Sequence, residues 1–176
     1  MGTGQTILSM AALMFLSTSL LNFYRLLGST GDDIASAQDG ILGTTICTSY
    51  MELASGLAFD SYTDTSEAAL TSIDVLTVPG VLGPETADED SVSEFNDFDD
   101  FNNFEVEKTA GGTSRKYKAK FNVYYVNPLN ISSISFARTY VKRLDVKIWR
   151  TFPPATEGSR LDTLRMSQVM GYFHFD

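Results

Sequence analysis

Cysteine and histidine are almost absent from this sequence of 176 residues, which contains one of each, Cys47 and His174. A single cysteine cannot form an intramolecular disulfide, and it cannot build a cysteine-based zinc site. A single histidine between Phe173 and Phe175 offers no Ser-His-Asp or Cys-His arrangement for nucleophilic catalysis. No glycine-rich loop carries the P-loop lysine. The sequence therefore predicts neither an enzyme activity nor a cofactor, and we expect Cys47 to be a small apolar side chain on a helix.

Basic residues are scarce in the first half of the sequence, where Arg25 is the only lysine or arginine before Lys108. The formal net charge is -9. This acidic balance argues against nucleic acid as the main partner, because a phosphate backbone requires a basic face on the protein. The separation of charge along the chain instead allows acidic and basic faces of neighbouring copies to meet.

A long apolar run opens the sequence, and Arg25 is its only charge between Ile7 and Leu27. The run contains no proline and is rich in leucine, methionine and alanine, which predicts a helix. At about 1.5 Å per residue, such a helix spans roughly the hydrocarbon thickness of a bilayer. A secretory signal peptide has a basic region before its apolar run and small residues at the cleavage site after it. Neither flank has these residues, so we do not expect an ordinary cleaved signal.

Apolar residues continue after this run at spacings of three and four, which predicts that the helix continues as an amphipathic one. We predict a single helix over residues 6–59. It belongs to two segments of the chain: residues 1–28, where the helix is apolar all round, and residues 29–60, where it is amphipathic. Gly28 and Gly31 lie between the two parts and favour a flexible joint there. The amphipathic part requires a globular partner to cover its apolar face. The apolar part requires lipid or other copies of itself.

Residues 61–176 are predicted to form a globular head that begins with irregular chain and includes an acidic loop over residues 85–107. Four phenylalanines recur at three-residue spacing inside this loop, at Phe95, Phe98, Phe101 and Phe104. They favour an irregular loop that is held to the core by its aromatic side chains. Calcium prefers carboxylate and amide oxygens, so Asp97, Asp99, Asp100 and Asn102 are candidate calcium ligands. The EF-hand spacing is missing, and a solvated acidic loop is the other interpretation.

Three segments near residues 115–126, 139–150 and 162–173 have the composition and alternation of β-strands. The predicted inward-facing residues of the first two are Tyr117, Ala119, Phe121, Val123, Tyr125, Leu144, Val146 and Ile148. Short connections between these segments favour an antiparallel meander, whose apolar face the amphipathic half of the helix would cover. The predicted fold class is therefore α+β, with a long N-terminal helix packed on a small antiparallel sheet.

Three short stretches resemble type IV pilins and pseudopilins. Gly4-Gln5-Thr6-Ile7-Leu8-Ser9 aligns with the prepilin pattern, with Gly4 at the processing position and Ser9 where the family carries glutamate. Asp99-Asp100-Phe101-Asn102 resembles an aspartate-rich loop of prepilin-like proteins, and Lys142 to Ile148 resembles their lysine-rich strand. The resemblance implies a pilin-like fold and a structural subunit of an extracellular helical filament. It also implies insertion in the cytoplasmic membrane before assembly, and a pilus-type assembly machinery as a partner.

A filament of this kind would be a polymer of this chain, with the apolar helices at its centre. The expected assembly core consists of Ile7, Leu8, Met10, Leu13, Met14, Leu16, Leu20 and Phe23. A charge as close to the apolar segment as Arg25 requires a partner, and Asp32 or Asp33 of a neighbouring copy is the expected one. The alternative interpretation is a single-span membrane anchor that carries an extracytoplasmic binding module.

Asn130 begins the triplet Asn130-Ile131-Ser132, which is an acceptor sequence for N-linked glycosylation. It follows a proline turn, so we expect it to lie on the surface and to be a candidate glycosylation site.

Overall fold

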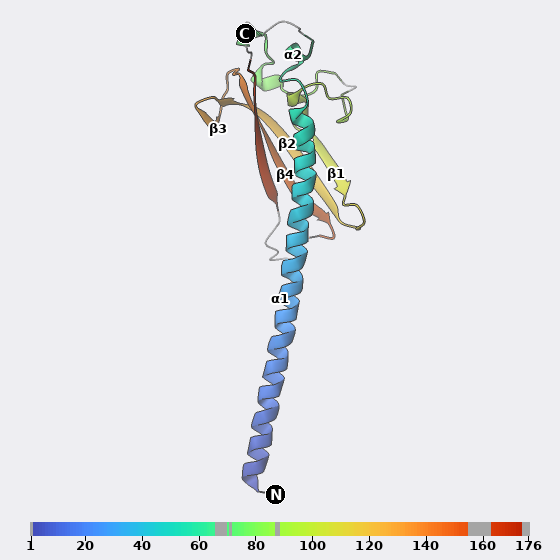
Figure 1. Cartoon of the computed structure of the whole chain (residues 1–176), viewed down its shortest axis with the longest axis vertical. Coiled ribbons are helices and arrows are strands. Elements are labelled where there is room, and N and C mark those ends of the chain that lie inside the picture. The colour runs from blue at the N-terminus through green and yellow to red at the C-terminus, as the bar shows by residue number, and fades with distance from the viewer. Residues whose placement is uncertain (1, 66–69, 71, 87–88, 155–162, 174–176) are drawn as a thin grey trace. The chain divides into compact units, whose positions relative to one another are not determined.

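The computed structural model describes residues 2–65, 70, 72–86, 89–154 and 163–173. Its helices are α1 (Thr3–Ser55) and α2 (Ser61–Thr65), followed by the 3-10 turns η1 (Ile73–Val75), η2 (Pro79–Val81) and η3 (Phe98–Phe101). Its strands are β1 (Glu105–Thr109), β2 (Lys116–Asn127), β3 (Asn130–Ile134), β4 (Val141–Phe152) and β5 (Leu164–Gly171). The fold is α+β, as predicted: the C-terminal part of α1 lies across one face of a small antiparallel sheet (Figure 1).

By its internal contacts the chain divides into a unit that ends at Asp39 and a unit that begins at Gly40. The first unit contains helix and no strand within its described residues. The second contains the remainder of α1 and the whole sheet, and it is called the head below. This division falls later in the helix than the predicted change from apolar to amphipathic sequence after residue 28.

Helix α1 contains 53 residues and ends at Ser55, whereas the sequence pattern predicted a helix over residues 6–59. The chain leaves the helix at Gly56, and both Phe59 and Asp60 are then buried in the head. Asp60 continues no helical turn: its backbone amide donates a hydrogen bond to the hydroxyl of Thr63 at 3.0 Å, and its carboxylate makes the contacts described below.

The glycines of the predicted joint do not break α1. Gly28 and Gly31 both have helical backbone. The hydroxyls of Ser29 and Thr30 donate hydrogen bonds to the carbonyl oxygen of Leu26, at 3.0 and 2.8 Å. A glycine costs a helix about 1 kcal/mol relative to alanine, which is too little to interrupt a helix with good helix formers on both sides. The joint predicted at Gly28 and Gly31 is therefore not visible as a break in α1.

The sheet has the order β1-β2-β4-β5, with all neighbours antiparallel, and β3 pairs with the end of β2. Strands β2, β4 and β5 are the predicted meander. Its register places Phe121 opposite Val146 and Val123 opposite Leu144. The predicted inward-facing residues of β2 and β4 are all buried, which confirms the period-two pattern of the sequence. Strands β1 and β3 were not predicted.

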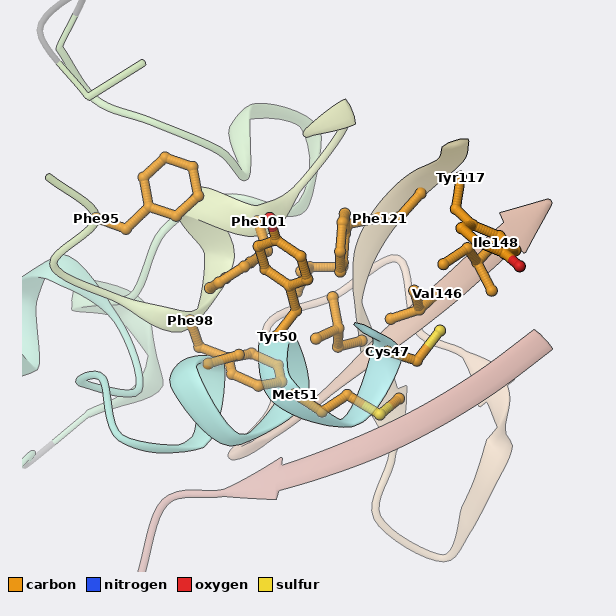
Figure 2. Packing of buried hydrophobic residues seen from close by; sticks show 14 of the residues in the cluster. Cys47, Tyr50, Met51, Phe95, Phe98, Phe101, Tyr117, Phe121, Val146 and Ile148 are labelled. Atoms are coloured by element: carbon orange, nitrogen blue, oxygen red, sulfur yellow. The ribbon is translucent and has the colours of Figure 1, made fainter. Parts of the chain in front are cut away.

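The main core of the head lies between the sheet and the last three turns of α1 (Figure 2). Cys47, Tyr50 and Met51 face the sheet from the helix, where the Tyr50 ring lies 5.2 Å from the ring of Phe121. A Cβ at Gly43 would lie 3.5 Å from the side chain of Ile148, so helix and strand come close at that point. Cys47 is buried as predicted, and its burial raises the pKa of the thiol to about 11.

The acidic loop is held to this core by its phenylalanines, as predicted. Phe95, Phe98 and Phe101 are buried (Figure 2). Phe104 is partly buried and packs against the same cluster. The Phe95 ring meets the rings of Phe101 and Phe104 edge to face, at 5.0 and 5.2 Å. The predicted loop over residues 85–107 is nevertheless more regular than expected, because it includes η3 and the start of β1.

Candidate functional site

The apolar half of α1 exposes its hydrophobic side chains in all directions. All eight residues of the predicted assembly core are more than half exposed: Ile7, Leu8, Met10, Leu13, Met14, Leu16, Leu20 and Phe23. Phe15 and Leu21, outside that list, are exposed to a similar degree. The helix is long and apolar enough to cross a membrane. A surface this apolar on every side of a helix requires lipid or protein around it rather than water.

The charged residues near this segment are also exposed. Arg25, Asp32 and Asp33 lie on α1, and no ion pair within the described residues joins Arg25 to either aspartate. Gly4 lies in the first turns of the helix, with open space where a side chain would stand. The pairing of Arg25 with Asp32 or Asp33 of a neighbouring copy stays a prediction.

A second feature of the head is a group of buried charges around Lys142, a residue that the sequence placed in a pilin-like strand without predicting its burial. Lys142 is fully buried on β4. Its Nζ donates hydrogen bonds to the carbonyl oxygen of Phe59 at 2.7 Å and to Asp60 Oδ2 at 2.8 Å. It is also in contact with Oδ1 of Asp99. Lys142, Asp60, Asp97 and Asp99 are called the Lys142 cluster below.

Two aromatic rings enclose the ammonium of Lys142. Its Nζ lies 4.7 Å from the ring centroid of Phe59 and 5.3 Å from that of Tyr125. The ring faces attract the cation and keep water away from it. Lys142 has the same parity along β4 as Leu144, so the alternation of that strand places it on the inward face. This alternation was the signal in the sequence that could have identified Lys142.

Asp60 is the most fully hydrogen-bonded carboxylate of the cluster. Its Oδ2 accepts from the backbone amide of Thr77 at 3.0 Å and from the hydroxyl of Tyr125 at 3.3 Å, besides Lys142. Its Oδ1 accepts from the hydroxyl of Thr77 at 3.2 Å. Burial alone would raise the pKa of Asp60, but the charge of Lys142 and these hydrogen bonds together hold that pKa below its usual value. Asp60 is therefore a charged partner of Lys142.

Asp97 and Asp100 cap the short turn η3. Asp97 Oδ1 accepts from the amide of Asp99 at 2.7 Å, and Asp100 Oδ2 accepts from the amides of Asn96 and Asp97 at 2.8 and 3.1 Å. Three carboxylate oxygens remain buried without a hydrogen-bond partner among the described residues: Asp97 Oδ2, Asp99 Oδ2 and Asp100 Oδ1. Burial, followed by the neighbouring charge of Asp99, raises the pKa of Asp97 to about 9. Burial also raises the pKa of Asp100.

Three of the calcium ligands that the sequence suggested, Asp97, Asp99 and Asp100, lie in groups of neighbouring carboxylates. One carboxylate oxygen each from Glu85, Asp97 and Asp99 lie within 4.8 Å of one another, and so do oxygens from Glu85, Glu89 and Asp100. Such oxygen ligands suit calcium by their chemistry. The fourth candidate, Asn102, uses its side chain elsewhere: Nδ2 donates to the carbonyl of Leu82, and Oδ1 accepts from the amide of Val123.

The interpretation of this stretch as a solvated acidic loop is wrong for its central carboxylates. Asp97, Asp99 and Asp100 are each fully buried. The phenylalanines between them draw the backbone into the core, and the carboxylates follow because they cap η3 and face Lys142. Hydropathy alone assigns such residues to the surface, since it has no term for a buried partner.

The raised pKa of Asp97 predicts that the head loses stability as the pH rises. Between the usual value of 3.8 and about 9, the folded head keeps a proton that the unfolded chain releases. The free energy of unfolding should therefore fall with pH across this window, by up to about 1.4 kcal/mol per unit. Urea titrations of the full chain in detergent at pH 5, 6, 7 and 8, followed by Trp149 fluorescence, measure this slope.

Asp97→Asn is the control for this pH dependence, because the amide has the same shape and no titration. This variant should show a smaller slope than the natural chain. Asp60, whose pKa is lowered, loses its contribution only when the pH falls below its usual value of 3.8, so it does not affect this window. An unfolding midpoint that rises from pH 5 to pH 8 would contradict a protonated Asp97.

The remaining candidates lie elsewhere. Asn130 is exposed at the start of β3, as expected for a glycosylation acceptor, and its Oδ1 accepts from the amide of Ser132 at 3.2 Å. His174 lies outside the described residues.

Comparisons with family models, with curated proteins and with solved structures find no match for this chain.

Proposed function

We propose that this chain is a structural subunit of an extracellular filament of the type IV pilus kind, and that it polymerises through its N-terminal apolar helix. The observation that carries the proposal is the exposure of the apolar side chains on every side of the first half of α1. This surface belongs to the same continuous helix that packs on the sheet of the head. The α+β head and the prepilin-like residues Gly4 to Ser9 support the same assignment.

Burial of such helices against one another is a sufficient driving force for a polymer. Each apolar side chain that is removed from water contributes about 1.5–3 kcal/mol, and the eight residues of the assembly core would each make such contacts. Before assembly, the same helix would be held in the cytoplasmic membrane, and a pilus-type machinery would extract it. A contact that repeats from copy to copy without closing then produces a helical filament. No nucleic acid partner is needed.

A second candidate function is a single-span anchor that carries an extracytoplasmic binding module. The same observation favours it, because a helix of this length and hydropathy fits a bilayer. The two candidates differ in stoichiometry: an anchor keeps its helix in lipid as one copy, whereas a filament replaces the lipid by many copies of the helix.

Electron microscopy of the sheared cell-surface fraction, with mass spectrometry of the same material, distinguishes the two candidates. We expect thin filaments that consist chiefly of this chain. Recovery of the chain only as a detergent-extracted monomer in the membrane fraction would reject the filament and support the anchor. The mass of the N-terminal peptide would also show whether the chain is processed at Gly4.

Arg25 provides matched variants for this experiment. An exposed arginine beside the apolar segment has no partner in its own chain among the described residues, so a filament must pair it with a neighbouring acidic group. Arg25→Ala should lower the yield of sheared filaments by roughly tenfold, as expected for a loss of about 1.4 kcal/mol per contact, while the chain remains in the membrane. Arg25→Lys keeps the charge and should lose less. An unchanged yield for Arg25→Ala would show that Arg25 is not an assembly contact.

A further inference from the structure

The head buries more carboxylates than cations. Among the described residues, the charged side chains that are fully buried are those of Asp60, Asp97, Asp99, Asp100 and Lys142. Buried charges in proteins are paired with an opposite charge or bind a metal ion. The ammonium of Lys142 contacts Asp60 and Asp99, so it cannot balance all of these carboxylates. We propose that the head binds one calcium ion through Glu85, Asp97 and Asp99. The inference goes beyond the proposed filament and does not rest on it, since all three residues lie in the head.

Asp97 and Asp99 each keep one carboxylate oxygen for a cation. Oδ1 of Asp97 accepts from the amide of Asp99 at 2.7 Å, and Oδ1 of Asp99 contacts Nζ of Lys142. The other oxygen of each aspartate, Oδ2, is buried and accepts no hydrogen bond from any described residue. A buried polar atom without a partner destabilises the fold. A cation bound by both Oδ2 atoms would supply that partner and would offset the repulsion between the two carboxylates.

Glu85 completes a group of three oxygens that has the spacing of calcium ligands. One carboxylate oxygen each from Glu85, Asp97 and Asp99 lie within 4.8 Å of one another. Calcium binds oxygen at about 2.3–2.6 Å, so two oxygens on the same ion lie at most about 5 Å apart. Glu85 is exposed whereas both aspartates are buried. The group therefore extends from the surface inward, and an ion can enter it from the solvent side, where water completes its coordination.

Glu89 holds Glu85 beside the aspartates. Oε2 of Glu89 accepts from the backbone amides of Glu85 and Thr86, at 2.9 and 3.2 Å. Its Oε1 accepts from Nδ2 of Asn96 at 2.9 Å. Asn96 directly precedes Asp97, so these hydrogen bonds connect the backbone of Glu85 to the start of η3. The ligands from the two segments are therefore brought together by the fold and not by the ion alone.

The neighbouring group of Glu85, Glu89 and Asp100 is less suited to bind the ion. Its oxygens also lie within 4.8 Å of one another. Both carboxylate oxygens of Glu89 already accept hydrogen bonds, however, and Oδ2 of Asp100 caps η3. Only Oδ1 of Asp100 is buried there without a partner among the described residues. This difference assigns the ion to Asp97 and Asp99, with Glu89 as a positioning residue.

The ligand set favours calcium over magnesium. Calcium is bound by about six to eight oxygens in a flexible geometry, and protein carboxylates commonly provide several of them. Magnesium requires a nearly ideal octahedron, is usually bound by only one or two carboxylates and keeps several of its waters. Three carboxylates, two of them buried, match the first description. Lys142 would remain on Oδ1 of Asp99, so the ion adds to the buried ion pair and does not replace it.

Calcium binding to the full chain in detergent tests the proposal. Equilibrium dialysis with radioactive calcium, after treatment with EGTA, should show one ion per chain. Urea titrations followed by Trp149 fluorescence then compare EGTA, calcium chloride and magnesium chloride at equal ionic strength. With calcium at about 100 times its dissociation constant, the unfolding midpoint should rise by roughly 1 M, and magnesium should give a much smaller shift. The pH titration described above concerns the calcium-free head, so EGTA is present in that experiment too.

The absence of both binding and a midpoint shift up to about 10 mM calcium would overturn the proposal, because even weak calcium modules bind at about 10⁻³ M. In that case protons, and not a metal ion, neutralise the buried carboxylates. A midpoint shift of equal size with magnesium would overturn the assignment to calcium.

Glu85→Gln and Glu94→Gln are a matched pair of variants for the site. Each removes one exposed negative charge from the same loop, but Glu94 belongs to neither group of carboxylates. Glu85→Gln should bind calcium at least tenfold more weakly, whereas Glu94→Gln should bind like the natural chain. Asp97→Asn should also lose the calcium-dependent shift of the midpoint. Equal weakening in both glutamate variants would indicate diffuse attraction to an acidic surface and overturn the site, and full binding by Glu85→Gln would exclude Glu85 as a ligand.

Discussion

Lys142→Met is expected to lower the free energy of unfolding of the head by about 3–5 kcal/mol. Methionine fills a similar volume, so the loss comes from charge rather than from a cavity. Without the ammonium, Asp60 and Asp99 remain buried with no cation to balance them. For a urea slope near 2 kcal/mol/M, the unfolding midpoint of the full chain in detergent should fall by roughly 2 M. Fluorescence of Trp149, the single tryptophan, follows the transition.

Lys147→Met is the matched control for this substitution. Lys147 is on the same strand, and its side chain is exposed, so its removal should change the stability by no more than about 0.5 kcal/mol. A second control neutralises the partners: in Lys142→Met with Asp60→Asn and Asp99→Asn, the uncompensated charges are gone and part of the stability should return. If Lys142→Met is as stable as the natural chain, Lys142 does not neutralise the buried aspartates.

The strands that sequence alone predicted are those that bury one face. Along β2, alternate residues such as Phe121 and Val123 are buried, and the alternation of apolar and polar residues encodes this directly. Strand β1 has no such pattern, since it consists mostly of charged residues and none is fully buried. It is held by pairing with β2 and by contacts such as the ion pair between Glu105 and Lys118 at 2.7 Å. Partners of this kind are distant in the sequence and cannot be inferred from a local pattern.

The buried charges were missed for a related reason. Asp60 and Lys142 are 82 positions apart, and Asp99 lies between them in the sequence. A lysine within a strand is normally assigned to the solvent face. The alternation of β4 was therefore not extended from Leu144 back to Lys142, although both residues are buried. The sequence did single out Asp97, Asp99 and Asp100, but as ligands or as a solvated loop. Their partner became evident only when the folded chain brought β4 beside η3.

For the apolar half of α1, the sequence predicted the exposed surface itself but not what covers it. Its composition predicted an exposed apolar helix, and the structure describes one. What covers that surface is decided by other molecules, which neither the sequence nor the fold of one chain contains. The assembly core from Ile7 to Phe23 therefore remains a prediction until filaments are examined.

Phe101→Ala is expected to destabilise the head by about 3–5 kcal/mol, because truncation of a fully buried aromatic ring leaves a cavity. The ring of Phe101 lies 5.0 Å from that of Phe95 and 5.6 Å from that of Phe121, so it joins the acidic loop to the sheet. The same urea titration measures the loss. Phe136→Ala is the control, since Phe136 is 94% exposed and its truncation should have little effect. A loss below about 1 kcal/mol for Phe101→Ala would show that the loop is not anchored there.

Phe101 and Lys142 should also be energetically coupled. Phe101 ends η3, the turn that carries Asp99, so its ring fixes the backbone that holds this carboxylate against the lysine. Once the ring is removed, the loop can move and expose Asp99 to water, and the loss of Lys142 then leaves a smaller buried charge. The double variant should therefore lose less stability than the sum of the two single variants, by about 0.5–3 kcal/mol. Strict additivity would mean that the aromatic anchor and the buried ion pair stabilise the head independently.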